Sequence, residues 1–167
     1  MAGAGARLVD DHPLRRLGGR GVFVCALLLA AWPAPAATQL MVSGTRDLTF
    51  GLVLPPVPSV VSPGDPSRSG AFDIVAAQGD RLRVRLTLPN SLAGSAGATL
   101  TISFAKGDAI GVIPGQAPLV LNPSATNVID LGSQDRMQIL LGGQVSPTGT
   151  QAAGTYAGTV VLTVTVF

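Results

Sequence analysis

The clearest pattern of apolar and polar positions lies at the C-terminal end of the chain, in residues 154–167. From Tyr156 onward, apolar side chains recur on one face and threonines occupy most of the other. The apolar face consists of Tyr156, Val160, Leu162, Val164 and Val166, with a gap at Gly158. A period of two residues keeps side chains on one side of a β-strand, which no helix does. The pattern predicts a half-buried strand that either completes its own sheet or pairs with another protein.

Short β-like runs separated by glycine, proline and aspartate fill most of the remaining chain. Strands are predicted at residues 48–54, 71–76, 81–88, 99–104, 119–121, 127–131 and 137–141. Residues 55–70 are predicted as a loop or irregular edge, because proline cannot donate to a sheet ladder. Gly142-Gly143 predicts a bulge or a sharp bend. No segment has a helical period over ten residues, so the pattern favours one antiparallel β-sandwich or small barrel.

The N-terminal region has a different composition and predicts a secretory signal peptide over residues 1–36. Four arginines precede an apolar run at residues 22–31, and the small-residue site Ala34-Pro35-Ala36 follows it. This order of basic, apolar and small residues is typical of a cleaved leader. The run is too short to cross a bilayer, which takes roughly 20 residues. We expect an exported chain whose domain comprises residues 37–167, with cleavage after Ala36 or Ala37.

Removal of this leader changes the charge and the chemistry of the chain. The basic pI of 9.3 reflects the leader, because seven lysines and arginines balance seven aspartates in residues 37–167. A near-neutral chain gives no reason to predict nucleic acid or an anionic membrane as a partner. His12, Cys25 and Trp32, each the only residue of its type, all lie in the leader.

The residue types left in the domain argue against catalysis. Without histidine or cysteine there is no Ser-His-Asp triad, no cysteine nucleophile and no ordinary zinc site. The aspartates lie in turns or on apolar strands, with no spacing that predicts a carboxylate pair. Asp130 and Asp135 are the best candidates for calcium ligands, although no calcium-loop motif is present. The sequence therefore predicts neither an enzyme nor a cofactor or metal site.

One predicted strand carries arginines on one face and apolar residues on the other. Arg81, Arg83 and Arg85 alternate with leucine and valine. This face is interpreted as a solvated outer surface that discourages wrong edge pairing; an anion- or glycan-contacting stripe is the alternative. Five aromatic residues remain in the domain, namely Phe50, Phe72, Phe104, Tyr156 and Phe167. They are better explained as core residues than as a sugar-stacking surface, although the core role of Phe167 is open because it lies on the other face of its strand.

Three short motifs resemble an uncharacterised secreted bacterial family, domain of unknown function 4402. They are Leu48-Thr-Phe-Gly51, Gly70-Ala-Phe-Asp-Ile-Val75 and the segment 151–160 with the alternating strand behind it. That family is similar in turn to spore-coat-U and chaperone–usher fimbrial subunits. The resemblance implies an immunoglobulin-like β-sandwich that lacks one strand. A periplasmic chaperone and then a neighbouring subunit would supply that strand by β-strand addition.

The leading hypothesis is an exported, non-catalytic structural subunit of a fimbria-like or cell-surface assembly. Its location would be the periplasm, the cell surface or the extracellular space, with no transmembrane segment after cleavage. The assembly residues we predict are Tyr156, Val160, Leu162, Val164 and Val166, with Leu40 and Val42 as candidates for a donated strand. Neighbouring subunits, self-association and a periplasmic chaperone are the expected partners. The alternative hypothesis is a secreted monomeric sandwich that binds a ligand or glycan.

Overall fold

The structure is a computed structural model that describes residues 39–167. The predicted leader at residues 1–36 lies outside the described residues. Twelve β-strands and one short 3₁₀ turn are present: β1 Met41–Arg46, β2 Ser59–Val61, β3 Gly70–Val75, β4 Arg81–Thr87, β5 Ser91–Ala93, η1 Ser95–Gly97, β6 Thr99–Ser103, β7 Ala109–Val112, β8 Leu119–Leu121, β9 Asn127–Asp130, β10 Arg136–Leu141, β11 Gly143–Ser146 and β12 Val161–Val166.

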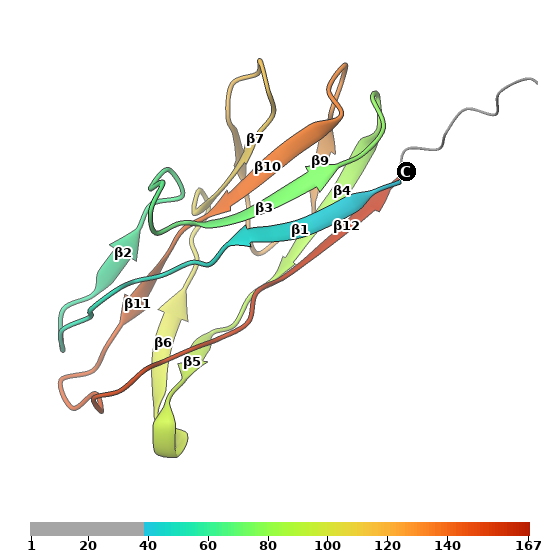
Figure 1. The fold of residues 1–167 in the computed structure, drawn as a ribbon. Helices are drawn as coiled ribbons and strands as arrows, with labels where there is room; N and C mark the ends of the chain where they lie inside the picture. The colour runs from blue at the N-terminus through green and yellow to red at the C-terminus, as the bar shows by residue number, and fades with distance from the viewer. Residues whose placement is uncertain (1–38) are drawn as a thin grey trace, which may run out of the picture. The chain divides into compact units, whose positions relative to one another are not determined.

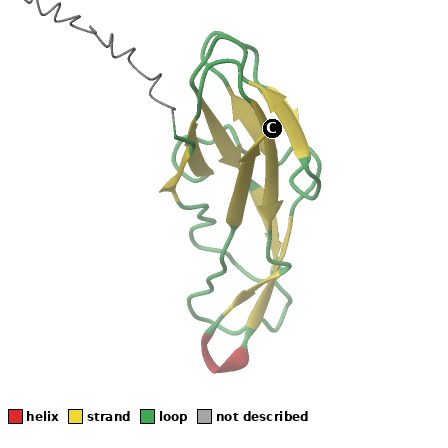
Figure 2. Ribbon diagram, turned by 90° about the vertical axis from the view of Figure 1, so that its right-hand side faces the viewer, coloured by secondary structure: helices red, strands yellow, loops and turns green. Residues whose placement is uncertain are grey.

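The strands form three antiparallel sheets, and the predicted all-β sandwich is confirmed. The five-stranded sheet has the order β1-β3-β10-β7-β8, and the three-stranded sheet has the order β12-β4-β9. A four-stranded sheet, β2-β11-β6-β5, forms the other half of the domain. Figure 1 shows this second half continuing from the ends of β10 and β4, and Figure 2 shows the layers from the side.

The main core lies between the five-stranded and three-stranded sheets. Strand β4 shows how the sequence builds it, because its leucines and valine are buried while its arginines are exposed. Inward residues of β3, β10 and β12 follow the same alternation, as expected for antiparallel sheets that are solvated on one face. Thirteen buried residues form this core, including Ile74, Leu82, Ile139 and Leu141.

The predicted bend at Gly142-Gly143 is where one long strand passes from one sheet to another. β10 pairs with β3 and β7, whereas β11, which begins one residue after Gly142, pairs with β2 and β6. A Cβ atom at Gly142 would overlap the carbonyl oxygen of Val61, so only glycine fits there. This close approach links the two halves of the domain.

Two sequence predictions of strands are wrong, one entirely and one in its extent. Residues 48–54 alternate as a strand would, but they form no ladder in the structure. The last strand was predicted from residue 154, but β12 begins at Val161. Strands β1, β2, β5, β7 and β11 were not predicted as such. β2, β5, β7 and β11 have three or four residues each, and β1 has only weak alternation. Both unpaired segments border the candidate site described below.

Within residues 39–167, no helix is long and apolar enough to cross a membrane.

Candidate strand-accepting groove

The first and last strands of the described domain are both sheet edges. β1 pairs only with β3, and β12 pairs only with β4. Each therefore has one side on which its N–H and C=O groups lack a neighbouring strand. Figure 1 shows that β1 and β12 run in opposite directions and end different sheets. Unpaired edges are ready templates for a further strand.

Beyond these two edges the chain forms no continuous ladder, apart from Arg46 at the end of β1 and a single bridge between Ala157 and Ala93, and a groove lies between the two segments. Residues 46–55 lead away from β1 and residues 151–160 lead into β12, and both line a groove of about 960 Å³. We call these segments the N-wall and the C-wall. The rest of the lining comes from Gly70, Phe72, Pro89, Leu92, Leu100, Ile102, Phe104, Leu141, Val145 and Pro147.

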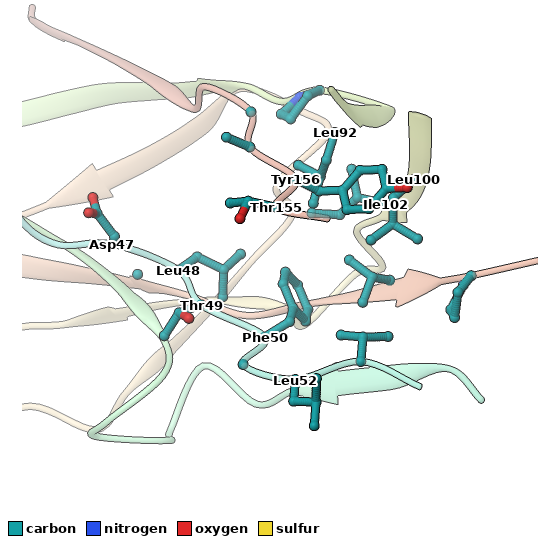
Figure 3. Close-up of a pocket in the computed structure, with 18 of the residues that line it drawn as sticks. Asp47, Leu48, Thr49, Phe50, Leu52, Leu92, Leu100, Ile102, Thr155 and Tyr156 are labelled. Carbon is teal, nitrogen blue, oxygen red and sulfur yellow. The ribbon is translucent and has the colours of Figure 1, made fainter. Parts of the chain in front are cut away.

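The floor of the groove is apolar and is the thin core of the four-stranded half. Only Leu100, Ile102 and Val145 are buried in that core. Phe50, Val53, Leu92, Phe104 and Tyr156 pack against them and stay half-exposed. Figure 3 shows Phe50 from the N-wall and Tyr156 from the C-wall among the residues that line the groove together with Leu100 and Ile102. The second core is therefore open along one side.

The N-wall alternates as a strand would, but one glycine reverses its parity. Leu48 and Phe50 are half-buried, and Gly51 then adopts a φ of +65°, a left-handed conformation that favours glycine. After this residue Val53 faces the core, whereas Leu52 and Leu54 are exposed. Within the described residues, no amide from Phe50 to Leu54 donates to a backbone carbonyl.

The N-wall is held at its start by a neighbouring loop. The Thr49 amide donates to the Arg68 carbonyl oxygen at 2.9 Å. The Arg46 guanidinium donates to the carbonyl oxygens of Ser69 and Pro66, both at 2.6 Å. Arg46 is the only cationic residue of the lining among the described residues. Asp47, the other charged residue of the lining, has no side-chain hydrogen bond or ion pair within the described residues.

Asp65 fixes the loop that holds the N-wall. Its carboxylate accepts hydrogen bonds from the amide and hydroxyl of Ser67 and from Arg68, whose Nε lies 2.9 Å away. These bonds, led by that of the Ser67 amide, hold the pKa of the Asp65 carboxyl far below its ordinary value. The ionised carboxylate therefore ties together the loop on which the N-wall rests.

The C-wall is organised by Tyr156. Its ring lies over Gly94, where an added Cβ would be 2.6 Å from a ring carbon. Its hydroxyl donates to the Ala152 carbonyl oxygen at 2.7 Å and accepts a bond from Gln151 Nε2 at 2.6 Å. Ala157 forms an isolated bridge with Ala93. In the described chain, no amide from Ala152 to Tyr156 donates to a backbone carbonyl.

The structure brings only some of the predicted assembly residues to the groove. Tyr156 and Val160 line it. Leu162 and Val164 pack half-buried on the main core, and Val166 is exposed at the end of β12.

The two residues predicted for a donated strand lie at the start of the domain. Leu40 packs half-buried on the main core, and Val42 is exposed on β1 and paired with Ile74 of β3. The segment that contains them is thus used in the sheet of its own chain.

Sequence reasoning missed the floor residues and the N-wall as parts of a site. Phe50, Phe72 and Phe104 were assigned to a core. They do pack against core residues, but each is only partly buried. The alternation of residues 48–54 was the available signal. That alternation indicated a strand. A strand with no partner in its own chain would have indicated a sheet edge that can pair with a strand from another protein.

The other candidates for chemistry each have local partners. Asp130 accepts a hydrogen bond from the Gly132 amide at 2.8 Å and lies 4.0 Å from Arg81. Asp135 pairs with Arg136, whose hydrogen bond and charge lower the pKa of that carboxyl. The described residues contain no cluster of three or more acidic, histidine or cysteine side chains placed to hold a metal ion.

The arginine stripe on β4 faces outward as predicted. All three arginines are exposed. Arg83 and Arg81 lie over the ring of Phe167, with the guanidinium carbons 4.5 Å and 5.3 Å from its centroid. Phe167 is therefore packed against charges on the outer face and not in the core.

A family model described as domain of unknown function (DUF4402) matches residues 40–166, and the chain belongs to this family. No curated protein and no solved structure matches the chain.

Proposed function

We propose that this protein is an exported, non-catalytic structural subunit that assembles when a strand from another polypeptide fills the groove. The observation that carries the proposal is the pair of facing walls. Both border an apolar floor that is open, and each contains a run of five amides, Phe50–Leu54 and Ala152–Tyr156, that donate to no backbone carbonyl within the described residues. A sandwich that was complete by itself would have paired these segments and closed the second core.

The chemistry of the groove defines the strand that it would accept. Each wall is ten residues long, which corresponds to about 33 Å if fully extended. An occupant of about eight to ten residues would turn four or five side chains toward the floor. Full burial of each large apolar side chain stabilises by about 1.5–3 kcal/mol. We therefore expect an uncharged strand with an apolar residue at every second position.

The unpaired backbone groups of the walls supply the other part of the affinity. The free amides of Phe50–Leu54 and Ala152–Tyr156 would form ladders with a strand inserted between them. In β-strand addition, ladders of this kind provide affinity and alternate side-chain pockets provide specificity. The similarity to spore-coat-U and fimbrial subunits suggested by the sequence motifs fits this mode of assembly, with a neighbouring subunit or a chaperone as the donor.

A denaturing gel without boiling tests the proposal, because completed β-sandwiches often resist detergent until they are heated. We expect the wild-type protein to form a ladder of bands that collapses to one band on boiling. Val160→Asp should abolish the ladder, because it places a charge in the groove. The matched control is Val161→Asp, since Val161 is the next residue and faces outward. It should leave the ladder unchanged.

Two results would contradict the proposal. One is a wild-type protein that is monomeric at all concentrations, unfolds cooperatively and shows no heat-sensitive bands. The other is an equal effect of the Val160 and Val161 variants. Glycan binding by such a monomer, lost on Arg83→Ala, would favour the alternative of a ligand-binding module.

A further inference from the structure

Three arginines form a row on the outer face of β4, the arginine stripe. Arg81, Arg83 and Arg85 occupy alternate positions of this strand, and all three are exposed. Side chains on one face of a strand are about 7 Å apart along the chain, so the stripe spans about 14 Å. Residues 37–167 contain seven lysines and arginines, and the stripe concentrates three of these seven positive charges on one strand.

The position of β4 removes the explanation that the sequence suggested for the stripe. Charged side chains discourage unwanted pairing when they lie on an edge strand. β4 is instead the central strand of its sheet, between β12 and β9. Arg83 has Thr165 of β12 on one side and Val128 of β9 on the other. Protection of an edge therefore does not explain a row of arginines centred on Arg83.

Acidic side chains compensate only one end of the stripe. Asp130 of β9 lies 4.0 Å from Arg81. Within residues 39–167, neither Arg83 nor Arg85 forms an ion pair, and their cross-strand neighbours on β12 are threonines. Like charges at this spacing repel each other. The stripe thus presents positive charge that the described part of the chain does not neutralise.

The ring of Phe167 orders two of the guanidinium groups. Those of Arg83 and Arg81 have their central carbons 4.5 Å and 5.3 Å from the ring centroid. A guanidinium that stacks on an aromatic ring keeps N–H donors at its edge, which can bind a carboxylate through two parallel hydrogen bonds. The ring therefore restricts the donors without neutralising them, and this lowers the entropic cost of fixing an anion there.

We infer that the arginine stripe binds an acidic polysaccharide, a chain of sugars that carry carboxylates. Successive carboxylates of such a polymer meet successive arginines, because both form regular rows. Thr163 and Thr165 lie beside the stripe on β12, and their hydroxyls can exchange hydrogen bonds with sugar hydroxyls. The choice of a polysaccharide rests on the export proposed above, whereas the choice of an anionic partner rests on the stripe alone.

Two other anionic partners fit the stripe less well. A second copy of the chain would need a matching row of acidic residues, but no two aspartates in residues 37–167 are two positions apart, and the sequence contains no glutamate. Nucleic acid binding draws its affinity from many phosphate contacts. The stripe offers three cations in a domain whose positive charges are balanced by aspartates, and such a domain provides little steering toward a phosphate backbone.

Binding of the whole chain to immobilised polygalacturonate at low ionic strength tests the inference, with uncharged dextran as the reference polymer. The double variant Arg83→Gln/Arg85→Gln should bind about tenfold more weakly than wild type, because two arginine–carboxylate contacts are lost. The matched control is Lys106→Gln/Arg136→Gln, which removes the same charge from two exposed positions outside the stripe. It should change the affinity by less than about twofold, since charges at a distance are screened.

A second measurement uses the wild-type protein and does not depend on the folding of any variant. Phenylglyoxal modifies exposed arginines, and mass spectrometry locates the modified residues. Bound polygalacturonate should slow the modification of Arg83 and Arg85 but not that of Arg136, which lies on β10 of the other sheet. Equal protection of all three arginines would overturn the assignment of the stripe as the binding site.

Three results of the binding experiment would also overturn the inference. The first is a wild-type protein that binds polygalacturonate no better than dextran. The second is an equal loss of affinity in the stripe variant and the control variant. The third is tighter binding to single-stranded DNA, or to vesicles of anionic phospholipid, than to polygalacturonate, because the partner would then be a nucleic acid or a membrane.

The outcomes also separate this inference from the proposed function. The heat-sensitive ladder of bands reports strand addition in the groove, which the stripe does not border. A ladder without binding to polygalacturonate overturns the inference alone. Stripe-dependent binding by a protein that forms no ladder supports the inference and contradicts assembly by strand addition.

Discussion

The two halves of this β-sandwich are built from the same kinds of strands but bury very different cores. Thirteen residues form the buried cluster between the five-stranded and three-stranded sheets, whereas the buried cluster of the half built on the four-stranded sheet has three. The first half has strands on both sides of its core. In the second half, two strand-like segments take the place of a closing layer, and the space between them is a groove.

The difference shows that a strand-like sequence needs a neighbour to become a strand. An isolated strand gains little stability, because the backbone ladder and the cross-strand contacts require a partner strand. Residues 48–54 and 154–160 have the alternation but no continuous partner strand, and only Ala157 forms a bridge, with Ala93. The half with the open core is therefore where assembly can add stability, and the half with the closed core is where the monomer obtains its own.

The largest expected effect comes from one substitution made in each core. Ile139→Ala removes a fully buried side chain from the main core, and we expect it to cost about 3–4 kcal/mol of unfolding free energy. Ile102→Ala, beside the open groove, should cost about 2 kcal/mol or less, because fewer atoms surround the deleted group. Urea denaturation of the two monomeric variants measures both values. Equal costs would mean that the second core is as closed as the first.

Hydrogen exchange should distinguish the two halves of the domain, because assembly should newly protect backbone amides only in the half with the groove. In the monomer, amides of Phe50–Leu54 and Ala152–Tyr156 should exchange rapidly, because they have no backbone acceptors. In assembled protein they should slow by at least about tenfold, which corresponds to about 1.4 kcal/mol of added protection. Amides within the β3–β10 ladder serve as the control and should be protected in both states. Slow exchange of the walls in the monomer would show that the groove is already closed.

A smaller effect is expected from the tyrosine hydroxyl that organises the C-wall. Tyr156→Phe removes the bonds to Ala152 and Gln151 while it keeps the ring over Gly94. The loss should be about 1 kcal/mol. Gln151→Ala should cost a similar amount or less, and the double variant should cost less than the sum, because one network is removed twice. Denaturant midpoints test this, and full additivity would show that the two groups act separately.

The smallest expected effect concerns the loop that supports the N-wall. The pKa of Asp65 is lowered in the folded state, so its ionised form stabilises the fold. That contribution is complete above the ordinary pKa of 3.8 and is lost as the pH falls toward the lowered value of the folded state. Thermal unfolding between pH 2 and pH 6 should therefore show a shallower acid loss for Asp65→Asn than for wild type. Asp73→Asn, on the outer face of β3, provides a comparison; identical profiles for wild type and Asp65→Asn would contradict the role of this carboxylate.

The sequence identified the β4, β6, β9 and β10 strands and the bend at Gly142 because these features are local. Alternation over five or more residues and a glycine pair are readable without knowing any neighbour. β1 and β7 escaped this reading, since their alternation is weak. The Gly51 reversal escaped it as well. A glycine permits a left-handed conformation but does not require one.

By itself, the sequence determined the all-β class, the faces of the long strands and the lack of histidine and cysteine in the domain. Those properties follow from composition and from the two-residue period of a strand. Only the tertiary structure decided that the strand-like segments 48–54 and 154–160 form no continuous ladder, that Leu40 and Val42 belong to the region of β1, and that the second core is open. Pairing depends on which edges the folded chain brings together, and no local pattern contains that information. The C-terminal strand is thus predicted by its alternation, but the groove beside its entry is a property of the fold.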